Sequence, residues 1–472
     1  MSIPFDDYPH EECGIIGVFA PHEDVARMAF FGLFALQHRG QEAAGIAVAD
    51  GQVMSLHKDV GLISQIFRSQ TLDELQGLYA IGHTRYSTTG SPAARNAQPF
   101  MIETMHGPLA LAHNGNLVNS AELRQMLLEE GVGLSSSSDT EVMTMMLARA
   151  KGKTWNQRIQ NCMQQWRGAY SLVILTQDCV YVARDAWGFR PLSVGLLPHG
   201  GFAAASETGA LQTLGCEAIR EVKPGEIVTL SENALVVHQA VKPEKPSARC
   251  VFEFIYFARP DHVWDGQSVH HVRQRLGEEL ARETNIEADV VIPVPDSSIP
   301  AAIGFSRITC IPFNDGFIKN RYIGRTFIEP TDSLRKQGVA LKFNVINENV
   351  RGKRVIMIDD SIVRGNTTGP IIKLLKNAGA EQVHVAITCP PITHPCFMGV
   401  DMGSYNNLIA HKRSVEEIRK TVKADSLTFL SLEGMMRAVG RQDGYCQACF
   451  TGKYPIAVDV MSVKTGFERN TK

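Results

Sequence analysis

The sequence predicts two domains of different class, an α+β domain followed by an α/β domain with a mainly parallel sheet. A chain of 472 residues with 44% hydrophobic content is too long for one typical domain. Short strand-like runs dominate the first half, whereas strands alternate with helical patterns in the second half. Between them lies a polar stretch with two closely spaced prolines, which we assign as a linker covering residues 242–249.

The expected elements follow from apolar periodicity. In the first half, two amphipathic helices are expected at Val25–Leu36 and Thr140–Ala150. The strands expected there are Ile15–Phe19, Ala44–Ala49, Ala80–Arg85, Leu109–His113, Ser171–Leu175 and Val180–Ala183. After the linker, one expected helix alternates with three expected strands: Pro370–Ala378 with Asp289–Pro293, Arg354–Ile358 and Gln382–Thr388.

Composition limits the function classes. The 47 Lys and Arg nearly balance the 49 Asp and Glu, so there is no overall basic field of the kind that binds nucleic acid. The longest apolar run, Met28–Leu36, is far too short to span a membrane. Residues 1–12 are acidic and lack an apolar core, unlike a secretory signal, which predicts a soluble, cytoplasmic protein. The ten cysteines are then better explained by catalysis or metal binding than by disulfides.

A phosphate-binding loop is predicted in the second half. The buried strand Val355–Ile358 ends at Asp359 and Asp360, and the loop after it leads into a helix. A glycine, hydroxyl groups and helix N-terminal N–H groups together suit an anion, while the paired carboxylates suit a sugar diol or Mg²⁺. Alternatively, the acids only end the strand and Thr367 only caps the helix. Neither a Walker loop nor a dinucleotide fingerprint is present. The expected phosphate ligands are Ser361, Arg364, Gly365, Asn366 and Thr367.

Residues 355–368 resemble the motif with which type I phosphoribosyltransferases bind phosphoribosyl pyrophosphate (PRPP). Further segments resemble the amidophosphoribosyltransferase family, which opens purine synthesis: Cys13-Gly14, Gln37–Glu42, His83–Tyr86, His113–Asn116, Pro295–Ser298 and Lys319–Thr326. The resemblance implies a propeptide at 1–12, then an N-terminal-nucleophile hydrolase sandwich (αββα) that releases ammonia from glutamine at 13–241. A phosphoribosyltransferase domain with a C-terminal cluster-binding segment would occupy 250–472.

For glutamine hydrolysis, the resemblance implies that Cys13 is the nucleophile once residues 1–12 are removed. Its freed α-amino group, with a pKa of about 8, would carry the proton. Asn114 and Gly115 would form the oxyanion hole. The alternatives are that Cys13 is a small buried apolar residue and that Asn114-Gly115 is a tight turn.

The resemblance also implies how the two ends of glutamine are held. Arg85 would bind the α-carboxylate, for which a planar two-pronged donor is well suited. Asp139 would accept from the α-amino group. The alternatives are a surface salt bridge for Arg85 and a capping box, Ser138 to Glu141, around Asp139.

In the transferase half, the resemblance implies that Ser297, Asp359 and Asp360 hold Mg²⁺, which prefers oxygen ligands. Lys319 and Arg321 would contact PRPP from a mobile basic loop, although an exposed charged loop would show the same composition. The family commonly has threonine where this chain has Asn366, so altered phosphate contacts are expected there.

The cysteines suggest a second kind of site. Cys446 and Cys449 form a C-x-x-C pair, which alone is compatible with zinc, a redox pair or no function. One group within the family carries a [4Fe-4S] cluster on four cysteines, matched here by Cys250, Cys396, Cys446 and Cys449. Four thiolates complete the ligand shell of such a cluster, and zinc is the alternative. The cysteines expected in the core are Cys162, Cys179, Cys216, Cys310 and Cys389.

The implied reaction couples the two domains. Cys13 would form a γ-glutamyl thioester, and the released ammonia would attack Mg-bound PRPP to give 5-phosphoribosylamine and pyrophosphate. Purine nucleotide feedback inhibition and a homo-oligomer, dimer or tetramer, are implied by the resemblance alone. Two rival classes are an amidotransferase sharing only the first half and a non-enzymatic nucleotide sensor. Residues 355–368 disfavour the first, and the intact candidate residues disfavour the second.

Overall fold

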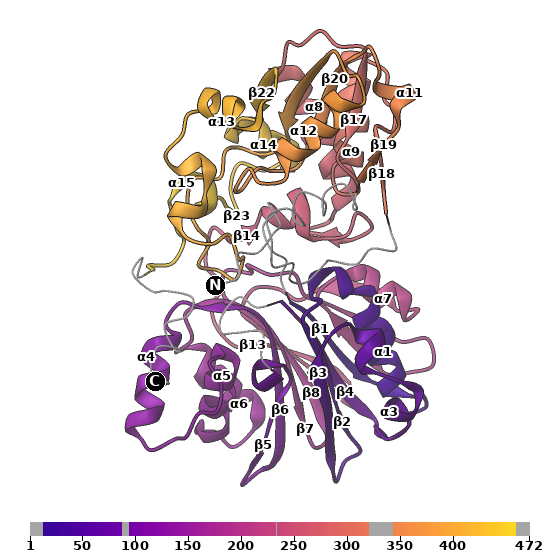
Figure 1. The fold of residues 1–472 in the computed structure, drawn as a ribbon. Coiled ribbons are helices and arrows are strands. Elements are labelled where there is room, and N and C mark those ends of the chain that lie inside the picture. Colours follow the sequence, from indigo (N-terminus) through magenta and orange to yellow (C-terminus); the bar gives the residue numbers. More distant parts are fainter. Residues whose placement is uncertain (1–12, 87–93, 233, 321–342, 459–472) are drawn as a thin grey trace.

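The computed structural model describes residues 13–86, 94–232, 234–320 and 343–458. The chain forms two stacked parts, with the N-terminal strands below and the C-terminal, orange and yellow elements above (Figure 1). Within the described ranges, no helix is both long and apolar enough to cross a membrane.

The first sheet is antiparallel, with the strand order β11-β9-β10-β1-β4-β2-β3. Its central strands β1 and β4 are fully buried because the second sheet covers one face and helices cover the other. The strands are β1 (Gly14–Phe19), β2 (Ala43–Ala49), β3 (Met54–Val60), β4 (Tyr79–Arg85), β9 (Ser193–Leu196), β10 (Phe202–Ala205) and β11 (Glu217–Glu221).

The second sheet is also antiparallel, with the order β13-β12-β8-β7-β6-β5. Its inner face packs on the first sheet through small and branched residues such as Ile15, Ile81, Ala112 and Val173. The strands are β5 (Phe100–Thr104), β6 (Gly107–Leu117), β7 (Gly168–Thr176), β8 (Cys179–Arg184), β12 (Glu226–Leu230) and β13 (Leu235–Gln239).

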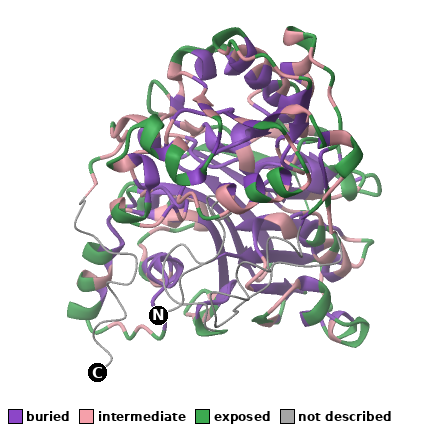
Figure 2. Ribbon diagram, turned by 45° about the horizontal axis from the view of Figure 1, so that its top comes forward, coloured by how far each residue is buried: buried purple, intermediate pink, exposed green. Residues whose placement is uncertain are grey.

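Helices cover the outer faces of both sheets. The first sheet is covered by α1 (Val25–Ala35), α2 (Ile63–Ile66), α3 (Ser69–Asp73) and α7 (Thr208–Thr213). The second is covered by α4 (Ser120–Glu129), α5 (Asp139–Arg149) and α6 (Trp155–Met163). Figure 2 shows the sheet strands mostly buried and the helices exposed on their outward sides. The predicted αββα sandwich is therefore confirmed.

The C-terminal domain contains a parallel sheet in the order β17-β20-β21-β22. Apolar residues on both of its faces form one core with the surrounding helices. The strands are β17 (Val290–Pro293), β20 (Arg354–Asp359), β21 (Gln382–Ile387) and β22 (Ser426–Phe429). The helices are α8 (Val269–Glu283), α9 (Ile299–Thr309), α11 (Asn347–Val350), α12 (Thr368–Asn377), α13 (Val415–Val422), α14 (Leu432–Val439) and α15 (Ala448–Thr451).

Short elements complete the C-terminal domain. A π-helix, η3 (Glu253–Phe257), follows the linker. The paired short strands are β14 (Arg249–Cys250) with β23 (Tyr445–Cys446), β15 (Val263–Trp264) with β16 (Gln267–Ser268), and β18 (Phe317–Lys319) with β19 (Phe343–Val345). The predicted α/β class of this domain is confirmed, while the boundaries at 12, 241 and 249 stay predictions.

Every strand and helix expected from periodicity is present. Their ends differ from the expected ones by three residues at most, except at the C-terminal end of one strand. β6 continues four residues beyond the expected end at His113, through Asn114 and Gly115 to Leu117. Asn114 pairs with Ser171 and Gly115 with Tyr170 in β7. The alternative of a tight turn at Asn114-Gly115 is therefore wrong.

Candidate active sites and cysteine cluster

Cys13 lies directly before β1 and is 5% exposed. Its Sγ donates to the backbone oxygen of Tyr86 at 3.4 Å. Burial raises the pKa of the Cys13 thiol to about 11, although the backbone of Tyr86 and the charge of Arg85 act to lower it. The thiol is consequently protonated at neutral pH and needs a base before it can attack.

Arg85 ends β4, and β4 pairs with β1 so that Thr84 is opposite Gly14. This register places Arg85 next to Cys13. The Arg85 side chain is 3% exposed. The alternative of a surface salt bridge is therefore wrong, because the guanidinium is buried beside the candidate nucleophile.

Asn114 is buried, and neither of its side-chain amide atoms has a hydrogen-bond partner among the residues that the structure describes. It adjoins the site because the carbonyl of the preceding residue, His113, accepts from His83 Nε2 of β4 at 3.2 Å. A buried amide without partners costs roughly 1–3 kcal/mol. Gly115 has φ of +144°, and a Cβ there would lie 2.0 Å from the Ala169 oxygen, so only glycine fits.

Asp139 is the first residue of α5, and its Oδ2 accepts from the Leu117 backbone N–H at 3.0 Å. Burial alone would raise the Asp139 pKa, but His113 and the backbone donors outweigh it and leave the pKa lowered. The carboxylate is therefore charged and suits an ammonium partner.

The N-cap of α5 is Ser138, as predicted, but the reciprocal half of the capping box is absent. Instead, the Glu141 carboxylate accepts from the N–H and hydroxyl groups of Ser135 and Ser136, all at 2.7 Å. These bonds tie down the serine segment that leads into the helix.

At the transferase site, the parallel strands β17 and β20 end side by side, so the residues after them meet. Ser297 Oγ donates to Asp360 Oδ2 at 2.5 Å, and Ser361 Oγ donates to Asp360 Oδ1 at 2.7 Å. Asp359 and Asp360 are both buried. Burial raises the Asp360 pKa to about 6, although the serine hydroxyls and Arg273 act to lower it.

The loop after Asp360 leads into α12, as the sequence predicts. Gly365 has φ of +78°, which favours glycine, and Asn366 is exposed at the loop tip. Thr367 is the residue before the helix but makes no side-chain cap bond. Thr367 therefore occupies the cap position, and its role as a phosphate ligand stays a prediction. Lys319 Nζ pairs with Asp296 at 2.7 Å, while Arg321 lies outside the described residues.

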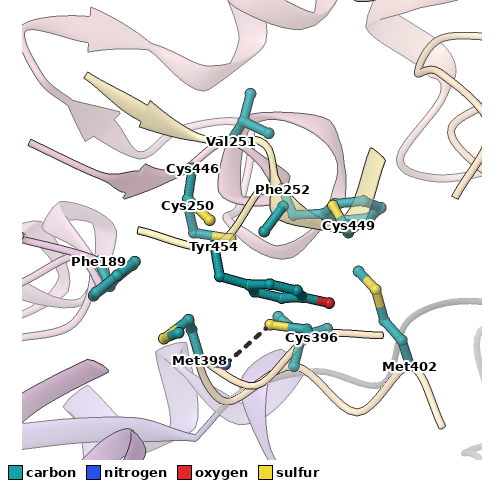
Figure 3. Close-up of a pocket in the computed structure, with 12 residues that line it drawn as sticks. Phe189, Cys250, Val251, Phe252, Cys396, Met398, Met402, Cys446, Cys449 and Tyr454 are labelled. Atoms are coloured by element: carbon teal, nitrogen blue, oxygen red, sulfur yellow. Dashed lines mark hydrogen bonds between the residues drawn. The ribbon is translucent and has the colours of Figure 1, made fainter. Parts of the chain in front are cut away.

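Cys250, Cys396, Cys446 and Cys449 line one pocket, together with apolar side chains such as Phe252 (Figure 3). Cys250 and Cys446 are paired across β14 and β23. Burial raises the pKa of Cys250 to about 11 and also raises those of Cys446 and Cys449. Among the described side chains, no group of three or more His, Cys, Asp or Glu is arranged to hold a metal ion.

The remaining cysteines are buried as expected, with one exception. Cys310 is exposed because it forms the left-handed C-cap of α9, with φ of 58°. The prediction that Cys310 belongs to the core is therefore wrong.

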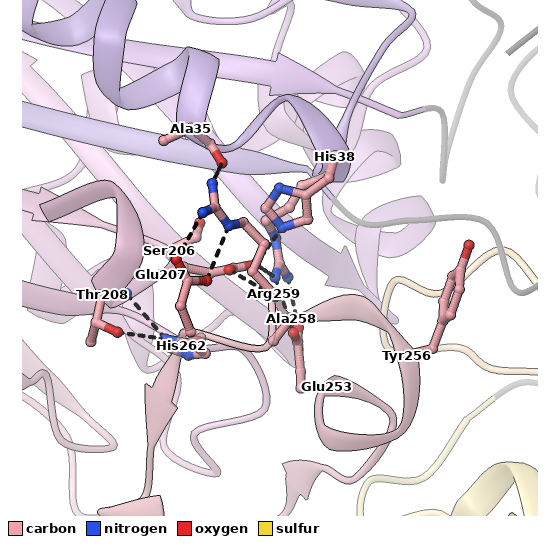
Figure 4. A network of polar contacts seen from close by, with 12 residues as sticks. Ala35, His38, Ser206, Glu207, Thr208, Glu253, Tyr256, Ala258, Arg259 and His262 are labelled. Atoms are coloured by element: carbon pink, nitrogen blue, oxygen red, sulfur yellow. Dashed lines mark hydrogen bonds and ion pairs between the residues drawn. The ribbon is translucent and has the colours of Figure 1, made fainter. Parts of the chain in front are cut away.

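A buried ion network between the domains was not predicted from the sequence. Arg39 donates to Glu207 at 2.6 Å and to Glu253 at 2.7 Å, and its Nε donates to the Cys13 carbonyl at 3.3 Å. Figure 4 shows Glu207, Glu253 and His38 gathered at this contact. Arg39 and Glu253 are 214 residues apart, so no local pattern could pair them.

The fold and these sites together define a glutamine amidotransferase domain joined to a phosphoribosyltransferase domain. Residues 83–213 match the glutamine amidotransferase domain family and residues 265–405 the phosphoribosyl transferase domain family. The chain is 48% identical to the amidophosphoribosyltransferase of Synechococcus elongatus, over 97% of this chain and 94% of that protein. It is 46% identical to that of Bacillus subtilis, over 95% of each chain. The chain belongs to the amidophosphoribosyltransferase family.

Solved structures agree with this assignment. One is glutamine PRPP amidotransferase from B. subtilis complexed with ADP and GMP. It is 45% identical, the match covers 96% of this chain and 99% of that one, and the TM-score is 0.90. The protein is an enzyme of purine biosynthesis that transfers ammonia from glutamine to PRPP, giving 5-phosphoribosylamine, glutamate and pyrophosphate. The rivals, an amidotransferase sharing only the first half and a nucleotide sensor, are wrong.

Proposed function

We propose that Cys13, freed by removal of residues 1–12, is the nucleophile of glutamine hydrolysis. The buried thiol, with its pKa raised to about 11, is a poor nucleophile at neutral pH. A free α-amino group on the same residue can accept the thiol proton and later deliver it to the leaving ammonia. Cleavage after Glu12 therefore supplies the base.

The observation that carries this proposal is the unsatisfied amide of Asn114. A buried amide without partners is costly, so its retention indicates a ligand that the amide meets during the reaction. In acyl transfer, that ligand is the oxyanion of the tetrahedral intermediate. The Asn114 amide and the Gly115 N–H supply its donors.

Arg85 and Asp139 bind the two charged ends of glutamine in this proposal. Both are buried and both act electrostatically on Cys13. The guanidinium takes the α-carboxylate and the charged Asp139 takes the α-ammonium group. Their opposite charges fix the direction in which glutamine enters.

In the transferase domain, Asp359 and Asp360 bind the ribose hydroxyls of PRPP. Ser361, Arg364, Gly365, Asn366 and Thr367 bind its 5-phosphate, and Lys319 and Arg321 bind its pyrophosphate. The oxygen donors of Ser297, Asp359 and Asp360 fit Mg²⁺, which binds through few protein groups together with substrate phosphates. Bound Mg²⁺ would neutralise the departing pyrophosphate.

The four pocket cysteines fit a [4Fe-4S] cluster better than zinc. Zinc requires all four sulfurs within about 2.3 Å of one point. A cluster takes one thiolate for each iron, so its ligands surround a space, as these thiols surround their pocket. Bound there, it would fasten the C-terminal segment to the linker and to the sheet.

In this proposal, the enzyme is inhibited by nucleotides and forms an oligomer, as the resemblance to its family implies. Purine nucleotides act as feedback inhibitors, consistent with the ADP and GMP named for the B. subtilis structure. The enzyme is cytoplasmic and forms a homo-oligomer.

Intact mass measurement with N-terminal sequencing tests the proposal. Active enzyme should begin at Cys13, and a preparation that retains residues 1–12 should lack glutaminase activity. Full glutaminase activity in a chain that begins at Met1 would contradict the proposed catalytic N-terminus.

A further inference from the structure

Glu253 belongs to the transferase domain but lies against the glutaminase site. It is the first residue of η3 and is 0% exposed. The η3 backbone is held to its own domain by Arg273, which donates to the carbonyls of Phe254, Tyr256 and Ala258, each at 2.8 Å. The Glu253 carboxylate is therefore a fixed buried charge at the domain interface.

Through Arg39, Glu253 is connected to the nucleophile. Arg39 donates to Glu253 Oε1 at 2.7 Å and Oε2 at 3.0 Å, a two-pronged contact that fixes the guanidinium plane. The Nε of the same guanidinium donates to the Cys13 carbonyl oxygen at 3.3 Å. The position of the Cys13 backbone thus depends on a carboxylate from the other domain.

Through Arg190, the same carboxylate is connected to the oxyanion strand. Arg190 Nη1 lies 3.9 Å from Glu253 Oε1, and its Nη2 donates to the Met398 carbonyl at 2.5 Å. The next residue, Gly399, packs so closely on Gly115 that a Cβ at Gly399 would lie 2.9 Å from the Gly115 carbonyl carbon. Asn116, beside Gly115, donates to the Phe397 carbonyl at 2.9 Å.

We propose that Glu253 is a positioning residue for glutamine hydrolysis, holding Cys13 through Arg39 and the Gly115 peptide through Arg190 and Gly399. The inference rests on the roles proposed above for Cys13 and Gly115. The positive charges of two buried guanidiniums, Arg39 and Arg190, are balanced by the negative charges of two buried carboxylates, Glu207 and Glu253. Because Glu253 belongs to the transferase domain, these charges are balanced only when the two domains are in contact.

The test is Glu253→Gln, which keeps the side-chain shape and removes the charge. Small displacements of reacting groups cost up to about 100-fold in rate, so kcat for glutamine hydrolysis should fall about 10-fold or more. The KM for glutamine should change little, because Arg85 and Asp139 are untouched. Ammonia-dependent synthesis should also change little, because the η3 backbone keeps its bonds to Arg273. Labelling of Cys13 by an electrophilic glutamine analogue should slow in parallel.

The matched control is Glu221→Gln. Glu221 also joins the domains, through Arg249 at 3.5 Å and Trp264 Nε1 at 3.2 Å, without contacting either site, and this variant should keep both activities. If Glu253→Gln does not fold, Arg190→Lys retains the buried charge balance and should show the same selective loss.

The inference would be overturned by an unchanged glutaminase kcat in Glu253→Gln, or by an equal loss of both activities in a folded protein. It would also be overturned if Arg190→Lys kept full glutaminase activity. Cys13→Ala, measured alongside, distinguishes failure of this inference from failure of the proposed function. If Cys13→Ala retains glutamine hydrolysis, the proposed nucleophile itself is wrong.

Discussion

Ser297 and Asp360 are joined by a hydrogen bond of 2.5 Å between Oγ and Oδ2, which connects the residues following β17 and β20. Because these strands are adjacent and parallel, their ends bring residues 63 positions apart into one site. The contact brings oxygen atoms together at the edge of the sheet where PRPP is proposed to bind.

Asp360 should make PRPP binding pH-dependent. Burial raises its pKa from 3.8 to about 6, so the carboxylate required for binding forms only as the pH rises through that value. The KM for PRPP should therefore fall as the pH rises through about 6 and then level off. Asp360→Asn should remove this dependence and raise KM about 10-fold or more, since a hydrogen bond to a charged group contributes roughly 1.5–3 kcal/mol.

The same shift affects stability. Because the folded state holds this proton more tightly than the unfolded state, Asp360 contributes stability that is complete below pH 3.8 and is lost as pH rises through about 6. Denaturant unfolding of wild type and Asp360→Asn across this range measures the difference. If the free energy of unfolding of the variant depended on pH in the same way as that of the wild type, the raised pKa of Asp360 would be contradicted.

Asn114→Ala should separate catalysis from stability. Removal of an oxyanion donor typically lowers kcat by about 10²–10³-fold, so glutamine hydrolysis should fall by that factor with little change in KM. The melting temperature should not fall, because the deleted amide has no hydrogen bond to lose within the described part of the chain.

Asn96→Ala is the matched control for that experiment. Asn96 is equally buried, but its amide accepts from the Ser137 backbone N–H at 3.1 Å and donates to the Ser137 hydroxyl at 3.1 Å. This variant should lower the melting temperature. Comparable destabilisation by both substitutions would show that the Asn114 amide has structural partners.

The cysteine pocket should contain iron. Anaerobically purified enzyme is expected to hold roughly four iron and four sulfide ions per chain, and Cys446→Ser should lose them and lower the melting temperature. Cys310→Ser, at an exposed position, should change neither. One zinc ion per chain without iron would favour the alternative.

The sequence was most informative where function depends on strand ends. Periodicity located β4 and β20, and hence Arg85 and Asp359, because a regular strand brings its last residue to a predictable edge. It was misleading at Asn114-Gly115, where a typical turn pair lies inside a strand. Gly115 is needed there for its φ of +144° and its close contact with Ala169. The contact of Arg39 with Glu253 depends on how the domains pack, which local patterns do not encode.

The central claim is that one chain contains two separate active sites, and that ammonia released at the first is consumed at the second. Cys13→Ala tests it most directly, with 5-phosphoribosylamine formation measured from glutamine and, separately, from ammonia. Glutamine-driven synthesis should be abolished because the thiol is required for the acyl-enzyme, whereas ammonia-driven synthesis should continue because Asp359, Asp360 and their loop are unchanged. Equal loss of both activities in a folded protein would contradict the two-site account.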